Sequence, residues 1–243
     1  MKIQARFFLM ILISAVSAGV LGAARLDVEF ADKDSSLPAI EKLKGPGNSL
    51  PRLPASQTNS THRFRLDSTQ STFIAHALRG GLLWFKGHEH LVAAREFFGE
   101  ATITDGKITP ASLQLTVKTD SMVETSDAFT EPQKQIINRE LREIVLEPEK
   151  YPEIVFKSTE VKGKQLANGQ YDLKIGGDLT LHGITRHIVI PAKVTVTGNN
   201  LRAVGEFSID RSDFNVKATS AFHGLIRVRK TVKFTFDIVG QRV

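Results

Sequence analysis

The sequence of 243 residues contains no cysteine, one tryptophan and two tyrosines. The absence of cysteine excludes a disulfide framework, a thiolate metal site and a cysteine nucleophile. The chain also has no run of five or more lysines and arginines, although its formal net charge is +6. A mild excess of this kind indicates a solvated basic surface and argues against nucleic-acid binding. Peripheral contact with anionic lipid head groups is compatible with it.

Motifs of catalysis are also scarce. The sequence has no HExxH zinc motif and no GxSxG nucleophile elbow. Asp120, Glu124 and Asp127 form an acidic stretch that we interpret as a solvated loop. Arg211 and Asp213 are expected to fix a corner of the chain. We therefore expect a protein that is not an enzyme and that needs no cofactor.

The N-terminus carries the pattern of a secretory signal. Lys2 and Arg6 precede an uncharged apolar run, Phe7 to Ala24, which ends in small residues. This pattern predicts a cleaved signal peptide at residues 1–24 and a periplasmic or secreted protein. An uncleaved membrane anchor is the alternative, because the run is nearly long enough to span a bilayer.

Residues 25–61 are rich in proline and small polar residues, which is typical of a flexible linker or arm. The globular domain is predicted at residues 62–243.

Within the domain, apolar and polar residues alternate with a period of two. The stretch from Glu147 to Ile190 shows this most clearly, with one apolar parity made of Ile154, Phe156, Leu173, Ile175, Leu179 and Leu181. Such alternation predicts strands with one buried face. Asn168-Gly169 and Asp105-Gly106 separate alternating runs and predict tight hairpins.

Two local expectations concern single segments. His182 is expected to be a turn residue that is hydrogen-bonded to the backbone. Phe64 to Asp67 is expected to form a short edge strand, which precedes a turn at Ser68 to Ser71.

One segment has a helical period instead. Between Thr130 and Glu147 the apolar residues are Ile136, Ile137, Leu141, Ile144 and Val145, with charges on the other face. The sequence thus predicts an all-β domain with one inserted α-helix, as a sandwich or a closed up-and-down barrel. Small inward residues such as Ala203 and Gly205 would either leave a cavity or interdigitate with large partners.

Several motifs, in order along the chain, resemble the YceI-like family of secreted, polyisoprenoid-binding proteins. They are FRLDSTQSTF from Phe64, LEPEKYPEIVFKST from Leu146, GDLTLHGITRHI from Gly177, FSIDRSDFNV from Phe207 and the closing VKFTFDIVG. The resemblance covers about residues 62–243. It implies a lipocalin-like antiparallel β-barrel of about eight strands around an apolar tunnel, with the helix near its mouth.

The ligand implied by the resemblance is an isoprenoid or another long-chain lipid. The inward aromatic and aliphatic residues are its candidate lining, although each could equally belong to a plain packing core. These candidates are Phe73, Leu113, Leu115, Phe156, Leu173, Ile175, Phe207, Phe234 and Phe236. A homodimer is a further expectation for partners.

Two other functions stay open. His88 and His90, with His76 on the preceding strand, could form an open zinc site of a metal-dependent hydrolase, or they could be ordinary histidines of a polar loop. The stretch around Gly87 to His90 also departs from the family pattern. Alternatively, the barrel is fully packed and the protein is an interaction module.

Overall fold

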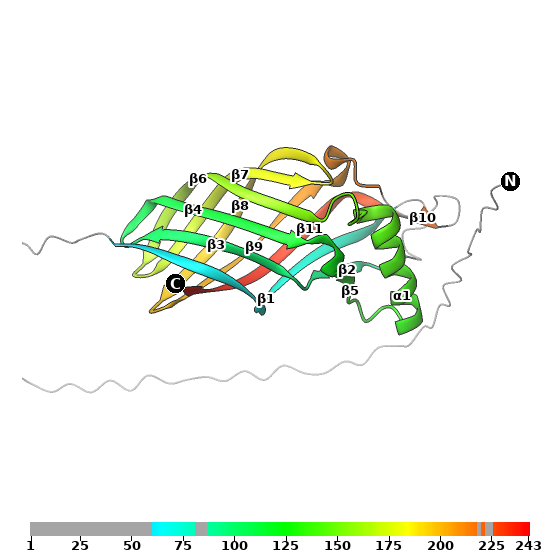
Figure 1. Cartoon of the computed structure of the whole chain (residues 1–243), viewed down its shortest axis with the longest axis horizontal. Helices are drawn as coiled ribbons and strands as arrows, with labels where there is room; N and C mark the ends of the chain where they lie inside the picture. Colours follow the sequence, from blue (N-terminus) through cyan, green and yellow to red (C-terminus); the bar gives the residue numbers. More distant parts are fainter. Residues whose placement is uncertain (1–59, 81–86, 218–219, 222–225) are drawn as a thin grey trace, which may run out of the picture. The chain divides into compact units, whose positions relative to one another are not determined.

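The structure is a computed structural model that describes residues 60–80, 87–217, 220–221 and 226–243 (Figure 1). The predicted signal peptide, nearly all of the linker, Trp84 and His223 lie outside the described residues. The strands are β1 (Thr61–Gly80), β2 (His90–Ala94), β3 (Phe97–Thr104), β4 (Lys107–Lys118), β5 (Met122–Glu124), β6 (Glu153–Ala167), β7 (Gln170–Leu181), β8 (Ile184–Thr197), β9 (Asn200–Asp210), β10 (Ser220–Ala221) and β11 (Ile226–Arg242).

Eight of these strands close into a barrel. The order is β1-β3-β4-β6-β7-β8-β9-β11, and β11 pairs back onto β1. All neighbouring pairs in this order are antiparallel. The short strands β2 and β5 extend the sheet beyond β1, and β10 pairs with β11. The predicted antiparallel barrel of about eight strands is confirmed.

The predicted hairpins are confirmed as well. Asp105-Gly106 joins β3 to β4 and Asn168-Gly169 joins β6 to β7, each as a two-residue turn. Gly106 has φ +66° and Gly169 has φ +70°, which glycine adopts without steric cost. His182-Gly183 makes the turn between β7 and β8, and both residues have positive φ.

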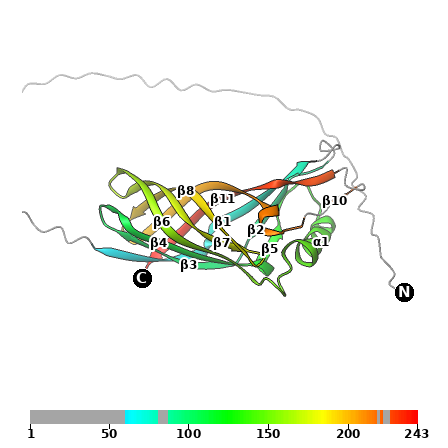
Figure 2. The same cartoon turned by 90° about the horizontal axis from the view of Figure 1, so that it is seen from above.

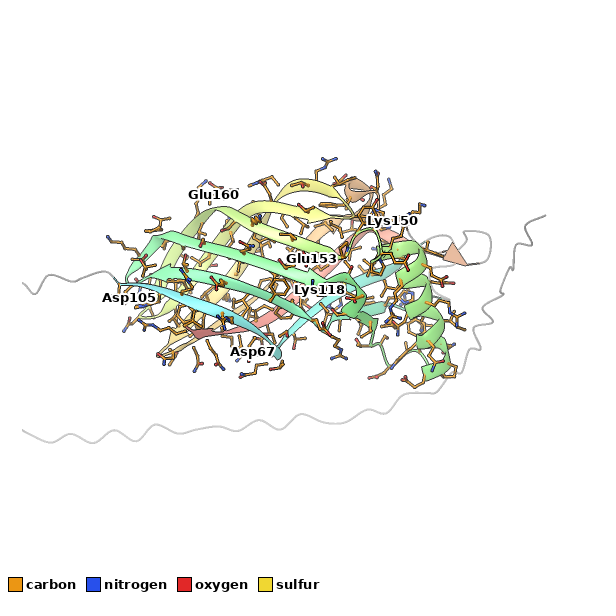
Figure 3. The ribbon with its side chains drawn as sticks, in the orientation of Figure 1. Asp67, Asp105, Lys118, Lys150, Glu153 and Glu160 are labelled. Carbon is orange, nitrogen blue, oxygen red and sulfur yellow. The ribbon has the colours of Figure 1, made fainter. Side chains whose placement is uncertain are left out.

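The prediction of an edge strand at Phe64 to Asp67 is wrong. β1 continues through this region to Gly80 and pairs with β3 and β11 along its first residues. The polar stretch after Asp67 is a bulge, where the pairing with β11 shifts. The Asp67 carboxylate accepts hydrogen bonds from Thr69 and Gln70, and the Ser71 hydroxyl accepts one from the Val239 amide. Figure 3 shows Asp67 where β1 bends.

The one predicted helix is confirmed. It consists of α1 (Glu131–Glu140), which continues as the π-helical turn η3 (Leu141–Leu146). A capping box between Thr130 and Gln133 starts it. Figures 1 and 2 show α1 beside β2 and β5 at one end of the barrel, with the C-terminus at the other end. No helix among the described residues is long and apolar enough to cross a membrane.

Two short one-turn 3-10 helices complete the domain, η2 (Thr119–Ser121) after β4 and η4 (Arg211–Phe214) after β9. The apolar core has two adjoining parts. One lies between β6, β7, β8 and β9 and includes Phe156 and Leu173, and the other lies around β1, β2 and η3 and includes Val92 and Leu141. Partly buried aromatic residues, among them Phe234 and Phe236, pack against both parts. These residues mark the middle of the barrel.

The end of η3 is fastened to the barrel by polar contacts. Glu147 has φ +45° and ends the helix, and its carboxylate lies 3.0 Å from Nε2 of the buried His182. The imidazole ring packs at 4.0 Å on the ring of Tyr151. His182 is thus a turn residue as predicted, but its partner is a carboxylate and not the backbone. The Thr119 hydroxyl donates to the Tyr151 carbonyl oxygen at 2.7 Å, which connects this turn to the end of β4.

We predict that Thr119→Val lowers the free energy of unfolding by about 1–2 kcal/mol, because Thr119 is buried and its replacement leaves the Tyr151 carbonyl without that donor. Thr185→Val is the matched control, since the Thr185 hydroxyl bonds to Thr180 at an exposed site. Urea unfolding of both variants measures the difference. Equal losses in the two variants would contradict the role assigned to Thr119.

Candidate ligand-binding interior

Four phenylalanines form one wall of the barrel interior. Phe73 of β1 lies opposite Phe236 of β11, and Phe234 of β11 lies opposite Phe207 of β9. The rings of Phe207 and Phe234 stack with centroids 4.9 Å apart, and those of Phe73 and Phe234 stack at 5.9 Å. We call Phe73, Phe207, Phe234 and Phe236 the aromatic wall. Three neighbouring strands supply it, so it depends on barrel closure.

The candidate lining residues all belong to the apolar core or pack against it. They differ in burial. Phe156, Leu173 and Ile175 are only 3%, 6% and 8% exposed, whereas the aromatic wall and Leu113 and Leu115 of β4 are only partly buried. A side chain that points into a closed barrel keeps accessible surface only where the interior is not filled. The interior is therefore tightly packed beside β6 and β7 and looser beside β1, β9, β11 and β4.

Two glycines shape this interior. A Cβ atom at Gly205 would lie 2.6 Å from Cζ of Phe236, and one at Gly177 would lie 2.7 Å from Cζ of Phe156. Both distances are shorter than real Cβ contacts, and a backbone carbonyl oxygen lies closer still, that of Pro191 at Gly205 and that of Lys157 at Gly177. Only glycine therefore leaves room for both the ring and the neighbouring backbone. Of the two roles expected for small inward residues, interdigitation with large partners holds at Gly205.

At the helix end, the core contains buried apolar residues that are not among the candidate lining residues. Val92 of β2, Met122 of β5, and Leu141 and Leu146 of η3 are buried in one part of the core. The helical period predicted that Leu141 faces inward. Val92 and Met122 gave no comparable signal, because each lies in a strand too short to show alternation.

The interpretation of Glu124 as part of a solvated loop is wrong. Glu124 is 4% exposed, and its carboxylate accepts hydrogen bonds from the amides of Leu91 and Ser126 and lies 2.7 Å from Nδ1 of His90. Its own amide donates to Oδ1 of Asn138 in α1. Glu124 therefore links β5 to β2 through its carboxylate and to α1 through its backbone amide. Asp120 and Asp127, by contrast, are exposed as expected.

The hydrogen bonds to Glu124 also set its ionisation. Burial by itself would raise the pKa of this carboxyl, but the bonds from His90 and from the Ser126 and Leu91 amides outweigh burial and lower it. Glu140 of α1 behaves in the opposite way. Its burial raises its pKa, although the nearby His90 acts against that rise.

The three candidate histidines do not converge on one point. His76 pairs with Glu89 and with the Thr235 hydroxyl, and it stands on the outer parity of β1. His90 lies opposite Ala77, on the inner parity, and pairs with Glu124. The ring of Phe129 contacts the rings of both His88 and His90. Among the described residues, no group of three or more histidine and carboxylate side chains could hold a metal.

A polar hollow lies near the end of β4. Its lining residues are Glu96, Lys118, Asp120, Pro148 and Pro152, and its volume is about 230 Å³. Figure 3 shows Lys118 and Glu153 side by side near this point, and their ion pair measures 2.5 Å. The Lys118 ammonium also lies over the ring of the exposed Phe98. An acidic and basic rim of this kind suits water and ions better than a lipid chain.

The lowered pKa of Glu124 predicts a pH dependence of stability. Because the folded-state pKa lies below the ordinary value of 4.5, the ionised carboxylate stabilises the fold above about pH 4.5, and this contribution is lost as pH falls through the folded-state pKa. Glu124→Gln should therefore be less stable than the parent protein at neutral pH, and the gap should shrink in acid. Urea unfolding from pH 7 down to pH 3 measures it; a gap independent of pH would contradict the assignment.

Two solved structures share the fold of this chain. BcnA of Burkholderia cenocepacia aligns with 72% of this chain and 98% of its own, with a TM-score of 0.53 and 19% identity. A polyisoprenoid binding domain of Saccharophagus degradans, implicated in plant cell wall breakdown, aligns with 74% of this chain and 98% of its own, with a TM-score of 0.50 and 13% identity. At these identities the likeness establishes the fold alone.

Sequence relatives point the same way. A UPF0312 protein of Vibrio parahaemolyticus is 32% identical over 142 residues, which is 56% of this chain and 67% of the relative. One from Vibrio cholerae is 33% identical over 132 residues, which is 52% of this chain and 64% of the relative. The matches thus span about two thirds of these relatives. The profile of the YceI-like domain matches residues 64–240, so this chain belongs to the YceI-like domain family.

Proposed function

We propose that this protein binds an isoprenoid or a similar long-chain lipid inside the barrel. The observation that carries the proposal is the partial exposure of the aromatic wall, whose side chains point into a closed barrel and are still not fully packed. A barrel of about eight strands is wide enough to hold one small apolar ligand beside its own side chains.

The chemistry of the wall suits a hydrocarbon chain. Phenylalanine and leucine offer no hydrogen-bond partner, so a polar ligand would lose its hydration there without compensation. An isoprenoid tail needs no such partner and gains about 0.8 kcal/mol for each buried CH2 group. The flat faces of Phe207 and Phe234, stacked in parallel, also give a smooth surface to a branched chain.

The likeness to a polyisoprenoid binding domain supports the same ligand class. We place the protein in the periplasm or outside the cell, with residues 1–24 removed as a signal peptide and residues 25–61 as a tether to the barrel domain at 62–243. Homodimer formation and peripheral contact with anionic lipids stay predictions.

We favour binding over hydrolysis because His76 and His90 lie on opposite faces of the sheet and have separate carboxylate partners. Zinc hydrolysis needs ligands that converge on one ion and leave an open position. We favour binding over a fully packed interaction module because the aromatic wall and Leu113 and Leu115 keep accessible surface.

Native mass spectrometry of protein secreted into the periplasm of its host tests the proposal. We expect a co-purifying species whose mass, after solvent extraction, is that of a neutral or anionic isoprenoid lipid. The same protein refolded from urea and stripped of lipid is the control. A protein that stays free of lipid in its own compartment, and that takes up no isoprenoid in vitro, would refute the proposal.

A substitution series tests the site. Phe207→Ala should weaken the binding of a fluorescent farnesyl probe by roughly 5- to 30-fold, because it removes about 1–2 kcal/mol of apolar contact. Val204→Ala is the matched control, since Val204 lies on the same strand but is exposed on the outer parity. Equal affinity in the two variants would show that the probe does not touch the aromatic wall.

A further inference from the structure

The pairing of β8 with β9 ends halfway along the barrel. The paired residues run from Thr197 with Asn200 to Ala192 with Gly205. On its other side β8 is paired with β7 from Thr195 to the turn at Ile184, and β9 is paired with β11 up to Asp210. Within these fully described strands, Ile184–Pro191 and Glu206–Asp210 are therefore not paired with each other. We call this stretch the β8–β9 seam.

Proline explains why the pairing ends there. In an antiparallel hairpin every second pair exchanges hydrogen bonds, starting with the pair that closes the turn, here Thr197 and Asn200. Counting back in twos, the next bonded pair after Lys193 with Val204 would join Pro191 to Glu206. Pro191 has no N–H to donate, so this pair cannot form in full. The amides beyond it on β8 face β9 without a ladder partner.

The seam leads directly to the aromatic wall. Phe207 of the wall is the second residue of β9 past the last pair, and Ile188 lies on the inward parity of the unpaired part of β8. Both side chains pack against the core and are only partly buried. An apolar chain that passed between the two strands would therefore meet apolar side chains at once.

A short corner of the chain covers the seam. It consists of η4 and the residues after it, up to Val216, and it packs against β8, β9 and β11. Phe214 is 1% exposed and lies in the same part of the core as Ile190 and Ile209. The Arg211 guanidinium holds the corner by donating to the carbonyl oxygens of Val216 and Arg229. The cover thus consists of the buried side chains of Phe214 and Val216 on a turn that is not part of the sheet.

Other partial gaps in the barrel are filled differently. Where β4 and β6 stop pairing, the Ser158 hydroxyl accepts from the Leu113 amide, and the interior beyond contains the buried Phe64 and Tyr171. Where β3 leaves β1, strand β2 takes its place. The helix end is fastened by the buried Glu124 and by Leu146 of η3. The β8–β9 seam differs from these gaps because it borders the aromatic wall, to which β9 contributes Phe207.

We propose that the lipid enters and leaves the barrel sideways through the β8–β9 seam, with Phe214 moving aside as the gate. This inference rests on the proposed lipid-binding function. Opening requires the release of one short corner, whereas passage past the helix would break the hydrogen bonds of Glu124 and uncover the apolar side of η3. Gates of this kind change the rate of exchange much more than the affinity.

A cross-link tests the route, because the chain has no native cysteine. Val189 and Ser208 are both exposed on the outer parity, and the register of the paired part, if continued into the seam, would set them opposite each other. The double variant Val189→Cys/Ser208→Cys is joined by a short bismaleimide. We expect it to release an NBD-labelled farnesol at roughly one tenth of the parent protein's rate or slower, with little change in affinity. The matched control is Lys193→Cys/Val204→Cys, which joins the same strands where they already pair.

Two single variants give independent evidence. Pro191→Val restores the missing N–H and should slow release of the probe, whereas Phe214→Leu removes part of the gate and should speed release. Release rates in the cross-linked seam equal to those of the control, or a failure of the two cysteines to cross-link, would overturn the route. If the parent protein bound no probe, both proposals would fail. If the parent protein binds the probe and every variant releases it at the parent rate, only the seam route is refuted and the binding proposal stands.

Discussion

The pairing of β11 with β1 is the constraint on which the rest of the structure depends. It closes the sheet, and closure turns the alternation of every strand into an inside and an outside. It also brings Phe73, near the start of the domain, opposite Phe236, near its end. The bulge after Asp67 bends β1, and this bend lets the first part of β1 pair with β3 and its later part pair with β2. The aromatic wall, the packed side and the helix end all follow from this closure.

Within the closed barrel the side chains are packed unequally, and the proposed ligand site lies where the packing is looser. Beside β6 and β7 the side chains of Phe156, Leu173 and Ile175 are buried, so that side supplies stability. Beside β1, β9 and β11 the rings are stacked on one another but retain free surface. A core that was equally tight everywhere would have no room for a ligand, and one that was loose everywhere would lack a unique fold.

Much of the fold was predictable from the sequence because it depends on local patterns. Period-2 alternation, the Asn168-Gly169 and Asp105-Gly106 turns and the helical period after Thr130 all act within a few residues. The errors concern long-range contacts. Glu124 looks solvated in an acidic stretch, but its partners Leu91 and His90 lie more than 30 residues away. The partner of His182 and the continuity of β1 depend likewise on contacts that a local pattern cannot encode.

The place of the candidate lining residues in the apolar core was predictable for the same reason, whereas their contact with a ligand stays a prediction. Parity alone selected the inward residues, but it could not separate the packed ones from those beside free space. Isotope-filtered NMR with a bound, unlabelled isoprenoid and a protein labelled at its phenylalanine rings tests the central claim most directly. The account predicts nuclear Overhauser contacts from the isoprenoid methyl groups to the rings of Phe73, Phe207 and Phe234. Contacts confined to the exposed Phe98, or no contacts to any phenylalanine, would contradict it.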